Sequence, residues 1–341
     1  MSHTYSSLKS TPREALGQSE AFLDFQERLA RVAPIDRPVL LLGERGTGKE
    51  LAATRLHFLS HRWQGPFITL NCASLAPALV EAELFGHERG AFTGADKRRT
   101  GRFEAANTGT LFLDEIGAIP IETQEKILRV VEYGRFERVG SSSPIEVDVR
   151  IISATNANLV QRCETGQFKP DLLDRLSFEV LFLPPLRNRS GDIRLLADHF
   201  AREMARELDR TEPPRFSNEA AALLEAYPWK GNVRELKNVV ERAVYRSSHH
   251  TIREIIFNPF SSPHGSLPDP PVPVKETMDQ QEVPDIFPDF TTMPLKSAVA
   301  TLEKLLLERA LAKSRHNQRR AAALLHLSYD QLRGLIRKHQ P

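Results

Sequence analysis

The chain has 341 residues, of which 40% are hydrophobic and 26% are charged, and its formal net charge is +2. This length and balance predict a soluble protein of more than one domain, and they exclude a strong whole-protein charge as the basis of nucleic-acid binding. No apolar run approaches the roughly 18 residues of a membrane span, and the amino terminus has no apolar signal region, so a cytoplasmic protein is expected. The two cysteines, Cys72 and Cys163, show no metal-ligand spacing and fit a reducing compartment.

The first predicted domain, residues 15–185, alternates helices with short apolar strands. It follows a polar segment, residues 1–14, that we expect to be flexible. A helix is predicted where apolar residues recur at helical spacing from Phe22 to Val32. Strands that are apolar on both faces and separated by helices are typical of an α/β fold with a parallel sheet covered on both sides. Five strands are predicted, at 38–42, 67–70, 110–113, 147–154 and 178–183.

The turn after the first predicted strand has the sequence of a phosphate-binding P-loop. A strand, a glycine-rich turn, a lysine and a helix follow one another, and this order favours a bound anion at the helix N-terminus. Lys49 is expected to lie against the β- and γ-phosphates of ATP. The residue after the lysine is usually Ser or Thr and holds Mg²⁺, but here it is Glu50, so the metal must depend on other carboxylates. The predicted ATP contacts in this turn are Gly43, Glu44, Arg45, Gly46, Thr47, Gly48, Lys49 and Glu50.

Two acids, Asp114 and Glu115, end the third predicted strand. Beside a P-loop, Asp114 is expected to hold Mg²⁺ and Glu115 to orient the attacking water. Asn71 ends the neighbouring strand and is a candidate hydrogen-bond partner of Glu115, although an asparagine that only forms a turn is the alternative. Thr155 and Asn156 end the fourth strand and are candidates for contact with the γ-phosphate or the water.

Two arginines are further candidates for phosphate contact. Arg234 lies early in a later helix, where a solvated surface arginine is the alternative reading. Arg175 precedes the fifth strand and is a candidate finger that reaches the nucleotide of a neighbouring subunit. Such a finger offsets charge in the transition state and accelerates hydrolysis by roughly 10³- to 10⁵-fold.

After residue 185 the sequence changes character twice. Residues 186–257 predict a small helical domain with helices at 193–208, 217–227 and 232–247, of which the second begins after a capping Ser217. Residues 258–294 contain nine of the 23 prolines and predict a semi-extended linker.

Residues 295–341 predict a DNA-binding domain. Residues 312–341 include seven Lys or Arg and one acid, a local basic patch. Helices at 319–325 and 329–338, joined by a tight turn, predict a helix-turn-helix whose second helix enters the major groove. A basic hairpin that packs a dimer remains the alternative, and the leucine-rich helix at 295–311 is expected to pair two chains. The candidate DNA contacts are Arg319, Arg320, Ser328, Tyr329, Gln331, Arg333, Arg337 and Lys338.

Two exposed aromatic residues are predicted outside these motifs. In residues 86–95, glycines flank a Phe-Thr tip, which predicts a loop that presents Phe92 to solvent. The alternative is an ordinary turn whose Phe92 folds back into the core. Trp63 precedes a Gly-Pro turn, and an exposed tryptophan suits a protein interface. Packing beneath a loop is the alternative for Trp63.

Residues 90–95 read Gly-Ala-Phe-Thr-Gly-Ala, which resembles the signature of bacterial enhancer-binding proteins, the AAA+ activators of sigma-54 RNA polymerase. The preceding Glu-Leu-Phe-Gly-His-Glu at 83–88, the Gly-Glu-x-Gly-Thr-Gly-Lys-Glu form of the P-loop and Gly-Asn-Val-Arg-Glu-Leu at 231–236 resemble this family too. The resemblance extends over about residues 15 to 245, and the tail fits it as well.

The resemblance implies a AAA+ P-loop ATPase sheet with a helical lid and a Fis-like helix-turn-helix. It implies ATP and Mg²⁺ as cofactors, a ring of six subunits, and sigma-54, RNA polymerase and enhancer DNA as partners. Glu50 is then ordinary, Asn71 switches Glu115, Thr155 and Asn156 form sensor I, and Arg234 forms sensor II. A second loop near residues 132–139 supports the tip. The sigma-54 contacts implied by the resemblance are Gly90, Ala91, Phe92, Thr93, Gly94 and Ala95.

The family presents two arginines across the subunit interface, and Arg175 matches one of them. At the other position this chain has Lys169, which keeps the charge but lacks the bidentate guanidinium, so its role stays open. The chain also resembles a group of these activators that have no attached receiver or sensor domain. Control by an inhibitory protein in trans is therefore expected, with Trp63 as its contact. The expected location is the nucleoid, and near the membrane only through that partner.

Two other functions remain possible from the sequence. The chain has the features of a AAA+ protein that remodels a different client, against which the Gly90–Ala95 signature argues. It is also compatible with a DNA-binding regulator that does not turn over ATP, against which Lys49, Asp114 and Glu115 argue.

Overall fold

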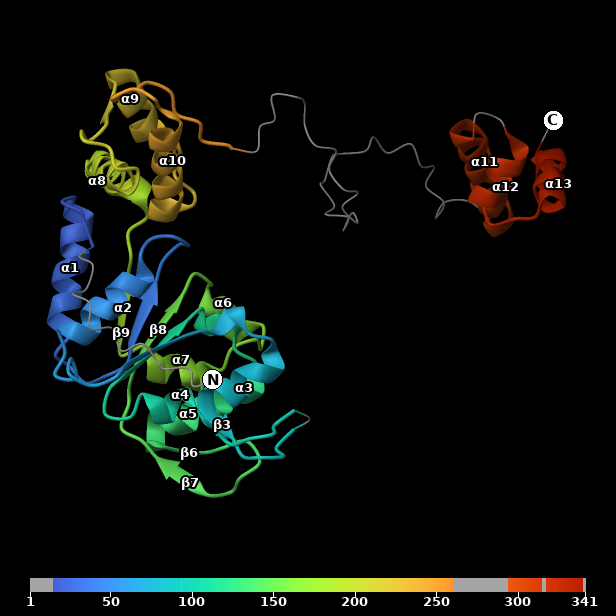
Figure 1. The fold of residues 1–341 in the computed structure, drawn as a ribbon. Helices are drawn as coiled ribbons and strands as arrows, with labels where there is room; N and C mark the ends of the chain where they lie inside the picture. The colour runs from blue at the N-terminus through green and yellow to red at the C-terminus, as the bar shows by residue number, and fades with distance from the viewer. Residues whose placement is uncertain (1–14, 93, 260–293, 315–316, 340–341) are drawn as a thin grey trace. The chain divides into compact units, whose positions relative to one another are not determined.

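The computed structural model describes residues 15–92, 94–259, 294–314 and 317–339 (Figure 1). The chain forms two units, Met1–Pro263 and His264–Pro341, and each is described here by itself. The predicted flexible segment 1–14 and most of the predicted linker 258–294 lie outside the described residues.

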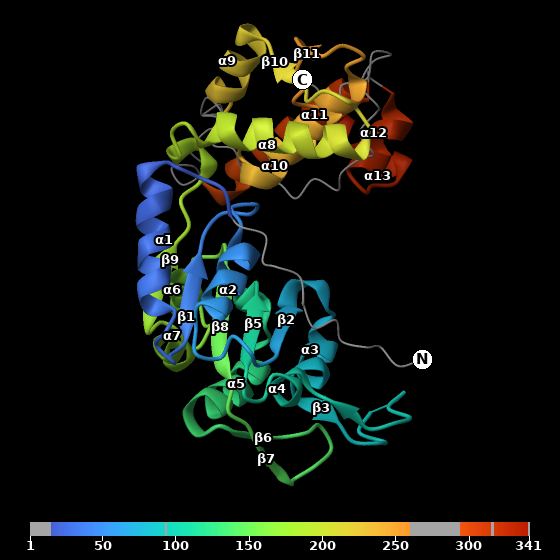
Figure 2. The same ribbon diagram turned by 60° about the vertical axis from the view of Figure 1, so that its left-hand side comes forward.

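The first unit is built on a five-stranded sheet in which every neighbouring pair is parallel. The order of the strands is β2-β5-β8-β1-β9, so β1 and the acidic strand β5 flank β8 (Figure 2). The predicted parallel sheet is confirmed, and all five predicted strands are present with ends shifted by a few residues. Their bounds are β1 Val39–Leu42, β2 Phe67–Asn71, β5 Thr110–Asp114, β8 Arg150–Thr155 and β9 Glu179–Phe182.

Successive strand residues are buried on opposite faces of the sheet, because side chains alternate along a strand. Leu111 and Leu113 pack with α3 (Pro77–Phe85), α5 (Ile121–Tyr133) and α7 (Pro170–Leu176), whereas Phe112 packs with α1 (Glu20–Val32) and α2 (Lys49–Phe58). The predicted apolar face of α1 is confirmed. Two short helices, α4 (Arg102–Ala105) and α6 (Leu159–Glu164), complete the layer around Leu111.

The helical part of the first unit has its own core around Trp229, whose Nε1 donates to the Leu224 carbonyl at 2.8 Å. It comprises α8 (Asp192–Glu207), α9 (Asn218–Ala226), α10 (Asn232–Arg246) and the strand pair β10 (Arg215–Phe216) and β11 (Thr251–Ile252). The predicted cap is confirmed, since Ser217 Oγ accepts from the Ala220 amide at 3.2 Å. A buried ion pair between Arg189 and Asp192 joins this part to the segment before α1, because Asp192 also accepts from the backbone and side chain of Ser19.

In the described part of the second unit, the chain forms three helices, α11 (Leu295–Lys313), α12 (Gln318–Leu324) and α13 (Tyr329–His339). Its small core contains Leu307, Ala322 and Leu332, so the predicted helix-turn-helix is confirmed. The turn between α12 and α13 includes His326 with φ 51°. None of the helices in the described part of the chain has the length and apolar character of a membrane span.

A buried histidine links three segments of the first unit. His57, on α2, is 2% exposed and packs against Phe67 at a ring-centroid distance of 5.0 Å. Its Nδ1 lies 3.0 Å from Thr110 Oγ1, and a backbone hydrogen bond joins the ring to Trp63. Burial, and next the positive charge of Arg150, lower the pKa of His57 to about 4. The imidazole is therefore neutral near pH 7, and its Nδ1 shares a hydrogen bond with Thr110 Oγ1.

This buried imidazole is expected to make the protein less stable as the pH falls below 6.5. The unfolded chain binds the proton at the ordinary pKa of 6.5, whereas the folded chain resists it down to about 4. The free energy of unfolding is therefore expected to fall by about 1.5 kcal/mol between about pH 6.5 and pH 5. Urea unfolding at the two pH values measures this, with His57→Gln as the comparison. An equal pH dependence in His57→Gln would assign the effect to other groups.

Candidate functional site

The predicted P-loop connects β1 to α2 at the carboxyl end of the sheet, where ligands of parallel α/β sheets bind (Figure 2). Gly46 and Gly48 have φ angles of 79° and 101°, a backbone conformation that favours glycine. A Cβ atom on Gly46 would lie 2.2 Å from the Gly231 carbonyl oxygen, so a side chain has no room there. Thr47 Oγ1 donates to the Glu44 carbonyl at 2.8 Å and closes the turn.

Lys49 lies within this turn and is 8% exposed. Its Nζ donates to the carbonyl oxygens of Gly43, at 2.9 Å, and Glu44, at 3.3 Å. Burial lowers the pKa of Lys49, and the carboxylates of Glu115 and Asp114 oppose this shift. A buried ammonium between a glycine turn and two acids is the arrangement that holds the terminal phosphates of a nucleotide.

The two predicted acids lie at the end of β5. Glu115 has φ 53° and ψ 47°, a left-handed conformation, and its amide donates to Asp114 Oδ1 at 3.0 Å. Burial and the neighbouring Glu115 carboxylate raise the pKa of Asp114, while Lys49 lowers it. Because burial and the neighbouring carboxylate disfavour the ionised form of Asp114, this site suits a cation, which would remove that cost.

Asn71 is near this pair, but its contact differs from the predicted one. Its Nδ2 donates to Asp114 Oδ2 at 3.3 Å, and the expected hydrogen bond to Glu115 is not the one formed. The reason is the register of the sheet, which pairs Asn71 with Asp114 while Glu115 has left the strand. Asn71 Oδ1 also accepts from the Ala73 amide at 3.0 Å, which is the turn-forming role of the alternative.

Thr155 and Asn156 adjoin the P-loop because β8 pairs with β1. Thr155 is 1% exposed, and its Oγ1 accepts from the Ala157 amide at 3.0 Å. The Gly43 amide donates to the Thr155 carbonyl at 3.3 Å. Of the two residues, only Asn156 has an exposed side chain at this edge of the sheet.

The first turn of α10 contacts the P-loop directly. The Val233 amide donates to the Gly46 carbonyl at 3.0 Å. Arg234 is exposed, and its Cβ would lie 3.1 Å from a Cβ atom on Gly46. Arg234 therefore lies beside the P-loop. This is the position that a residue of the helical part needs in order to contact a bound phosphate.

Asn232 was not among the predicted site residues, yet it bonds to two residues of the P-loop. It is completely buried with φ 53°. Its Nδ2 donates to Glu44 Oε2 and to the Arg45 carbonyl, each at 3.0 Å, and its Oδ1 accepts from the Leu186 amide at 2.8 Å. Hydrogen bonds from Arg187, and then Asn232, lower the pKa of Glu44 to about 2. The one sequence signal was asparagine after glycine at a helix start, because asparagine tolerates a left-handed φ.

The two candidate interface cations lie at opposite ends of α7 and pair with α5 of the same chain. Arg175 Nε lies 2.9 Å from Glu132 Oε1, and its side chain is 60% exposed. Lys169 Nζ lies 2.5 Å from Glu125 Oε1. Both cations are therefore on the surface, held by single carboxylates that a stronger anionic partner can replace.

The signature loop leaves the first unit between β3 (Gly86–His87) and β4 (Arg99–Thr100). Its described part is closed by a hydrogen bond from the Gly90 amide to the Ala95 carbonyl at 2.9 Å. Phe92 is 40% exposed, and its ring packs edge-on against His87 at 4.9 Å, so it neither enters the core nor points freely into solvent. Thr93, the second predicted tip residue, lies outside the described residues.

A second ribbon, β6 (Arg135–Glu137) with β7 (Pro144–Glu146), packs against the signature loop near the predicted segment 132–139 (Figure 2). The Glu88 amide donates to the Val139 carbonyl at 3.0 Å. Arg138 lies 2.9 Å from Glu88 Oε1 and also pairs with Glu104, so it ties the loop base to α4. The ribbon follows α5 directly, which connects it to the elements that hold Arg175 and Lys169.

In the second unit, all eight predicted DNA contacts are exposed on α12, α13 and the turn between them. Four of these side chains already have partners, among them Tyr329, whose hydroxyl donates to Gln318 Oε1 at 3.3 Å. Ser328 and Gln331 bond to each other's backbone amides, at 2.9 and 3.3 Å, which caps α13. Lys338 Nζ lies 2.8 Å from Glu303 Oε2 on α11. Arg333 and Arg337 therefore stand out on α13 as exposed cations.

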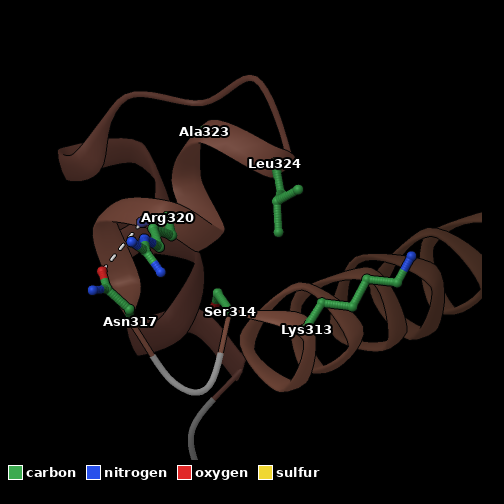
Figure 3. A pocket seen from close by; sticks show the side chains of 6 residues that line it. All are labelled: Lys313, Ser314, Asn317, Arg320, Ala323 and Leu324. Carbon is green, nitrogen blue, oxygen red and sulfur yellow. Dashed lines mark hydrogen bonds between the residues drawn. The ribbon is translucent and has the colours of Figure 1, made fainter. Parts of the chain in front are cut away.

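A hollow of about 620 Å³ lies between the end of α11 and α12 (Figure 3). Two of its lining residues, Lys313 and Arg320, are basic, and the Arg320 amide donates to Asn317 Oδ1 at 3.2 Å. Because the adjoining residues 315–316 lie outside the described residues, we assign it no ligand.

The two tryptophans have opposite surroundings. Trp229 is fully buried, whereas Trp63 is 54% exposed in the turn that follows α2. Arg62 anchors this turn through ion pairs of 2.6 Å with both Asp36 and Asp148. The predicted exposure of Trp63 is confirmed, and its contact with a partner remains a prediction.

The parallel sheet, the P-loop, the paired acids and the helical lid define a AAA+ ATPase. Family models match residues 15–181 as a sigma-54 interaction domain, residues 187–262 as a AAA+ ATPase lid domain and residues 298–339 as a bacterial regulatory protein of the Fis family. The chain belongs to the sigma-54-dependent enhancer-binding activators, which confirms the resemblance seen in the sequence. It is therefore an ATPase with a DNA-binding helix-turn-helix.

Several relatives are similar along most of this chain. The Psp operon transcriptional activator of Escherichia coli K12 is 50% identical over 327 residues, which cover 95% of this chain and 97% of that protein. NtrC of Rhizobium meliloti 1021 is 42% identical over 344 residues, which cover 95% of this chain and 69% of that protein. Among solved structures, NtrX from Brucella abortus in complex with ATP aligns with a TM-score of 0.64 and 33% identity, over 95% of this chain and 69% of that chain. The predicted ATP-binding fold is thereby confirmed.

Proposed function

We propose that this protein activates a phage-shock operon in response to envelope stress, by coupling ATP hydrolysis in a ring to remodelling of the sigma-54 RNA polymerase closed complex. The observation that carries the proposal is the half-exposed Phe92. It lies on a loop whose base is fixed by Arg138 and Glu88 to the ribbon that follows α5. The likeness to the Psp operon activator supports the choice of operon.

In the proposed mechanism, Lys49 and the amides of the P-loop hold the phosphates of ATP, and Arg234 approaches them from the lid. Asp114 is the candidate ligand of Mg²⁺, which takes one or two carboxylates and completes its coordination with phosphate oxygens and water. This fits the end of β5, where burial and the neighbouring Glu115 carboxylate raise the pKa of Asp114. The bound metal would neutralise charge that develops on the phosphates.

Glu115 is the proposed group that orients and polarises the attacking water. Asn71 is the proposed switch: its Nδ2 bonds Asp114 in the present structure, and a bound nucleotide and metal that engage Asp114 would leave Nδ2 available to Glu115. Thr155 and Asn156 are the proposed sensors of the γ-phosphate, the first through its backbone contact with Gly43. Arg175 of a neighbouring subunit completes the site, and six subunits close the proposed ring.

DNA binding is proposed to use a pair of helix-turn-helix units. On α11, Leu295, Val299 and Leu302 are 80%, 46% and 42% exposed, and Leu306 continues the same face at helical spacing. A second copy of α11 is the proposed occupant, because enhancer sites with two-fold symmetry require a paired reader. Arg333 and Arg337 are then the proposed contacts in the groove and on the phosphates.

Control is proposed to come from an inhibitory protein that binds Trp63. The support is the large exposed indole, held by Arg62, together with the likeness to the Psp operon activator. Such a partner would also bring the protein from the nucleoid toward the membrane.

Sigma-54 capture by protein trapped with ADP and aluminium fluoride tests the client assignment. Trapped wild type is expected to retain sigma-54 on gel filtration, whereas Phe92→Ala and Thr93→Ala are expected to lose it while keeping ATP turnover. Phe92 supplies an exposed aromatic contact, and such contacts often account for 2 kcal/mol or more of binding, about 30-fold in affinity.

Leu223→Ala is the matched control, since Leu223 is an apolar residue of the lid that is 50% exposed. It should retain sigma-54 as wild type does. A trapped wild type that hydrolyses ATP without retaining sigma-54 would instead support a AAA+ remodeller of another client. A protein that binds DNA without turnover would support the regulator without ATPase activity.

A further inference from the structure

His57 lies where the two elements of the ATP site and the exposed tryptophan turn meet. It is on α2, which begins with Lys49, and it contacts Thr110, the first residue of β5, which ends with Asp114. The same ring makes the backbone hydrogen bond to Trp63. One buried side chain thus contacts both elements that supply the catalytic groups.

The contact between His57 and Thr110 is a brace, because it joins the helix α2 to the strand β5. Along α2, eight residues from Lys49 to His57 span about 12 Å. Along β5, four residues from Thr110 to Asp114 span about 13 Å. The Nδ1–Oγ1 hydrogen bond of 3.0 Å therefore joins the two elements at the ends away from the nucleotide. Because protein interiors are close-packed, a displacement at one end of α2 or β5 is expected to move the other end of the same element.

Hydrogen bonds also hold the turn that contains Trp63 to the brace formed by His57 and Thr110. Ser60 Oγ donates to the His57 carbonyl at 2.7 Å. Arg62 Nη1 donates to the Asp148 carbonyl at 3.0 Å, and it reaches the Gly109 carbonyl, next to Thr110, at 3.5 Å. The turn therefore cannot shift far without moving the start of β5 or the end of α2.

We propose that His57 is a positioning residue that couples the ATP site to the Trp63 turn. Through its bonds to Thr110 and to the Trp63 backbone, it sets the position of β5 against α2. Binding at either end then shifts the other, because coupling between two sites is reciprocal. The proposal rests on the proposed function only in treating the Trp63 turn as a place where a regulator binds. The nucleotide half of the coupling stands without a partner.

Fluorescence of Trp63 tests the coupling without any partner. In the full chain carrying Trp229→Phe, Trp63 is the single tryptophan, and its quenching by acrylamide is measured with and without ADP and aluminium fluoride. The trapped nucleotide is expected to change the quenching constant. Thr110→Val removes the hydroxyl that bonds to Nδ1 with little change in shape, and it is expected to abolish this response. Its kcat for ATP is expected to fall about tenfold with KM near the wild-type value, because β5 carries the misplaced acids.

Two variants separate positioning from simple packing. His57→Leu is expected to lose the response, whereas His57→Asn, whose side-chain oxygen can accept from Thr110, is expected to recover part of it. Thr69→Val on β2, an exposed threonine of the neighbouring strand, is the matched control and should respond as wild type does. The comparison is repeated in the chain that keeps Trp229, in case Trp229→Phe destabilises the protein. Trp229 is fully buried and is therefore shielded from the quencher.

The proposal is overturned if trapping leaves Trp63 quenching unchanged in the wild-type background, or if Thr110→Val keeps both the full response and kcat. A protein that captures sigma-54 but shows no Trp63 response loses only the coupling. A protein with the Trp63 response that fails to capture sigma-54 keeps the coupling and loses the proposed client.

Discussion

Replacing Arg175 by alanine is expected to reduce ATP turnover by about 10³-fold or more while ATP affinity stays near the wild-type value. In its own chain, Arg175 is 60% exposed and bonds to Glu132 on α5. The P-loop of that chain is instead surrounded by Lys49, Arg234 and the acid pair. In the proposed ring, this exposed guanidinium would reach the nucleotide of the neighbouring subunit, where it would stabilise charge in the transition state. Steady-state phosphate release and equilibrium ATP binding measure the two quantities separately.

Mixing subunits shows whether the arginine acts in trans. Lys49→Ala subunits are expected to lose ATP binding but to retain Arg175, whereas Arg175→Ala subunits are expected to bind ATP without the proposed finger. Each variant alone should be nearly inactive, whereas a mixture is expected to regain turnover at the boundaries where an intact P-loop meets an intact arginine.

Lys169→Ala is the matched comparison because Lys169 pairs with the same helix, through Glu125. A smaller loss than for Arg175→Ala is expected, since an ammonium offers no bidentate contact. Full activity of Arg175→Ala would remove the finger assignment, and an inactive mixture would argue against action across the boundary.

The strands and the phosphate-binding turn could be predicted from sequence because their signals are local. Short apolar runs identify buried strands, and the order of strand, glycine turn, lysine and helix identifies residues 43–50. The position of Asp114 and Glu115 beside them followed from one further rule, that the carboxyl ends of parallel strands share an edge. The loop that carries Phe92 was predicted from the glycines that flank it, and its packing against His87 was not predicted.

The hydrogen bonds of the site depend on register and on long-range contacts, which sequence patterns do not specify. Asn71 bonds Asp114 because the two residues pair across β2 and β5, whereas Glu115, the predicted partner, has already left the strand. The same holds for His57 and Thr110, which are 53 residues apart in the chain and meet only in the folded core. Their types alone, a histidine and a threonine in apolar surroundings, gave no signal.

Asn232→Ala is expected to lower the free energy of unfolding of the lid by about 3–5 kcal/mol and to weaken ATP binding. The substitution leaves the buried Leu186 amide without its acceptor and removes two donated bonds to Glu44 and Arg45. It also places alanine at φ 53°, which asparagine tolerates better. Because the same contacts hold the first turn of α10 against Gly46, Arg234 would lose its position beside the P-loop.

Urea unfolding followed by Trp229 fluorescence measures this effect within the lid, since the Asn232 amide donates to the Trp229 carbonyl at 2.8 Å. Asn232→Gly relieves the φ strain but not the lost bonds, so it should recover only part of the stability. Asn238→Ala, at an exposed position of the same helix, should leave stability and ATP affinity near the wild-type values. If Asn232→Ala lowered stability without changing ATP affinity, the contact would hold the lid together without shaping the nucleotide site. A loss of both would show that one buried amide joins the lid to the phosphate-binding turn.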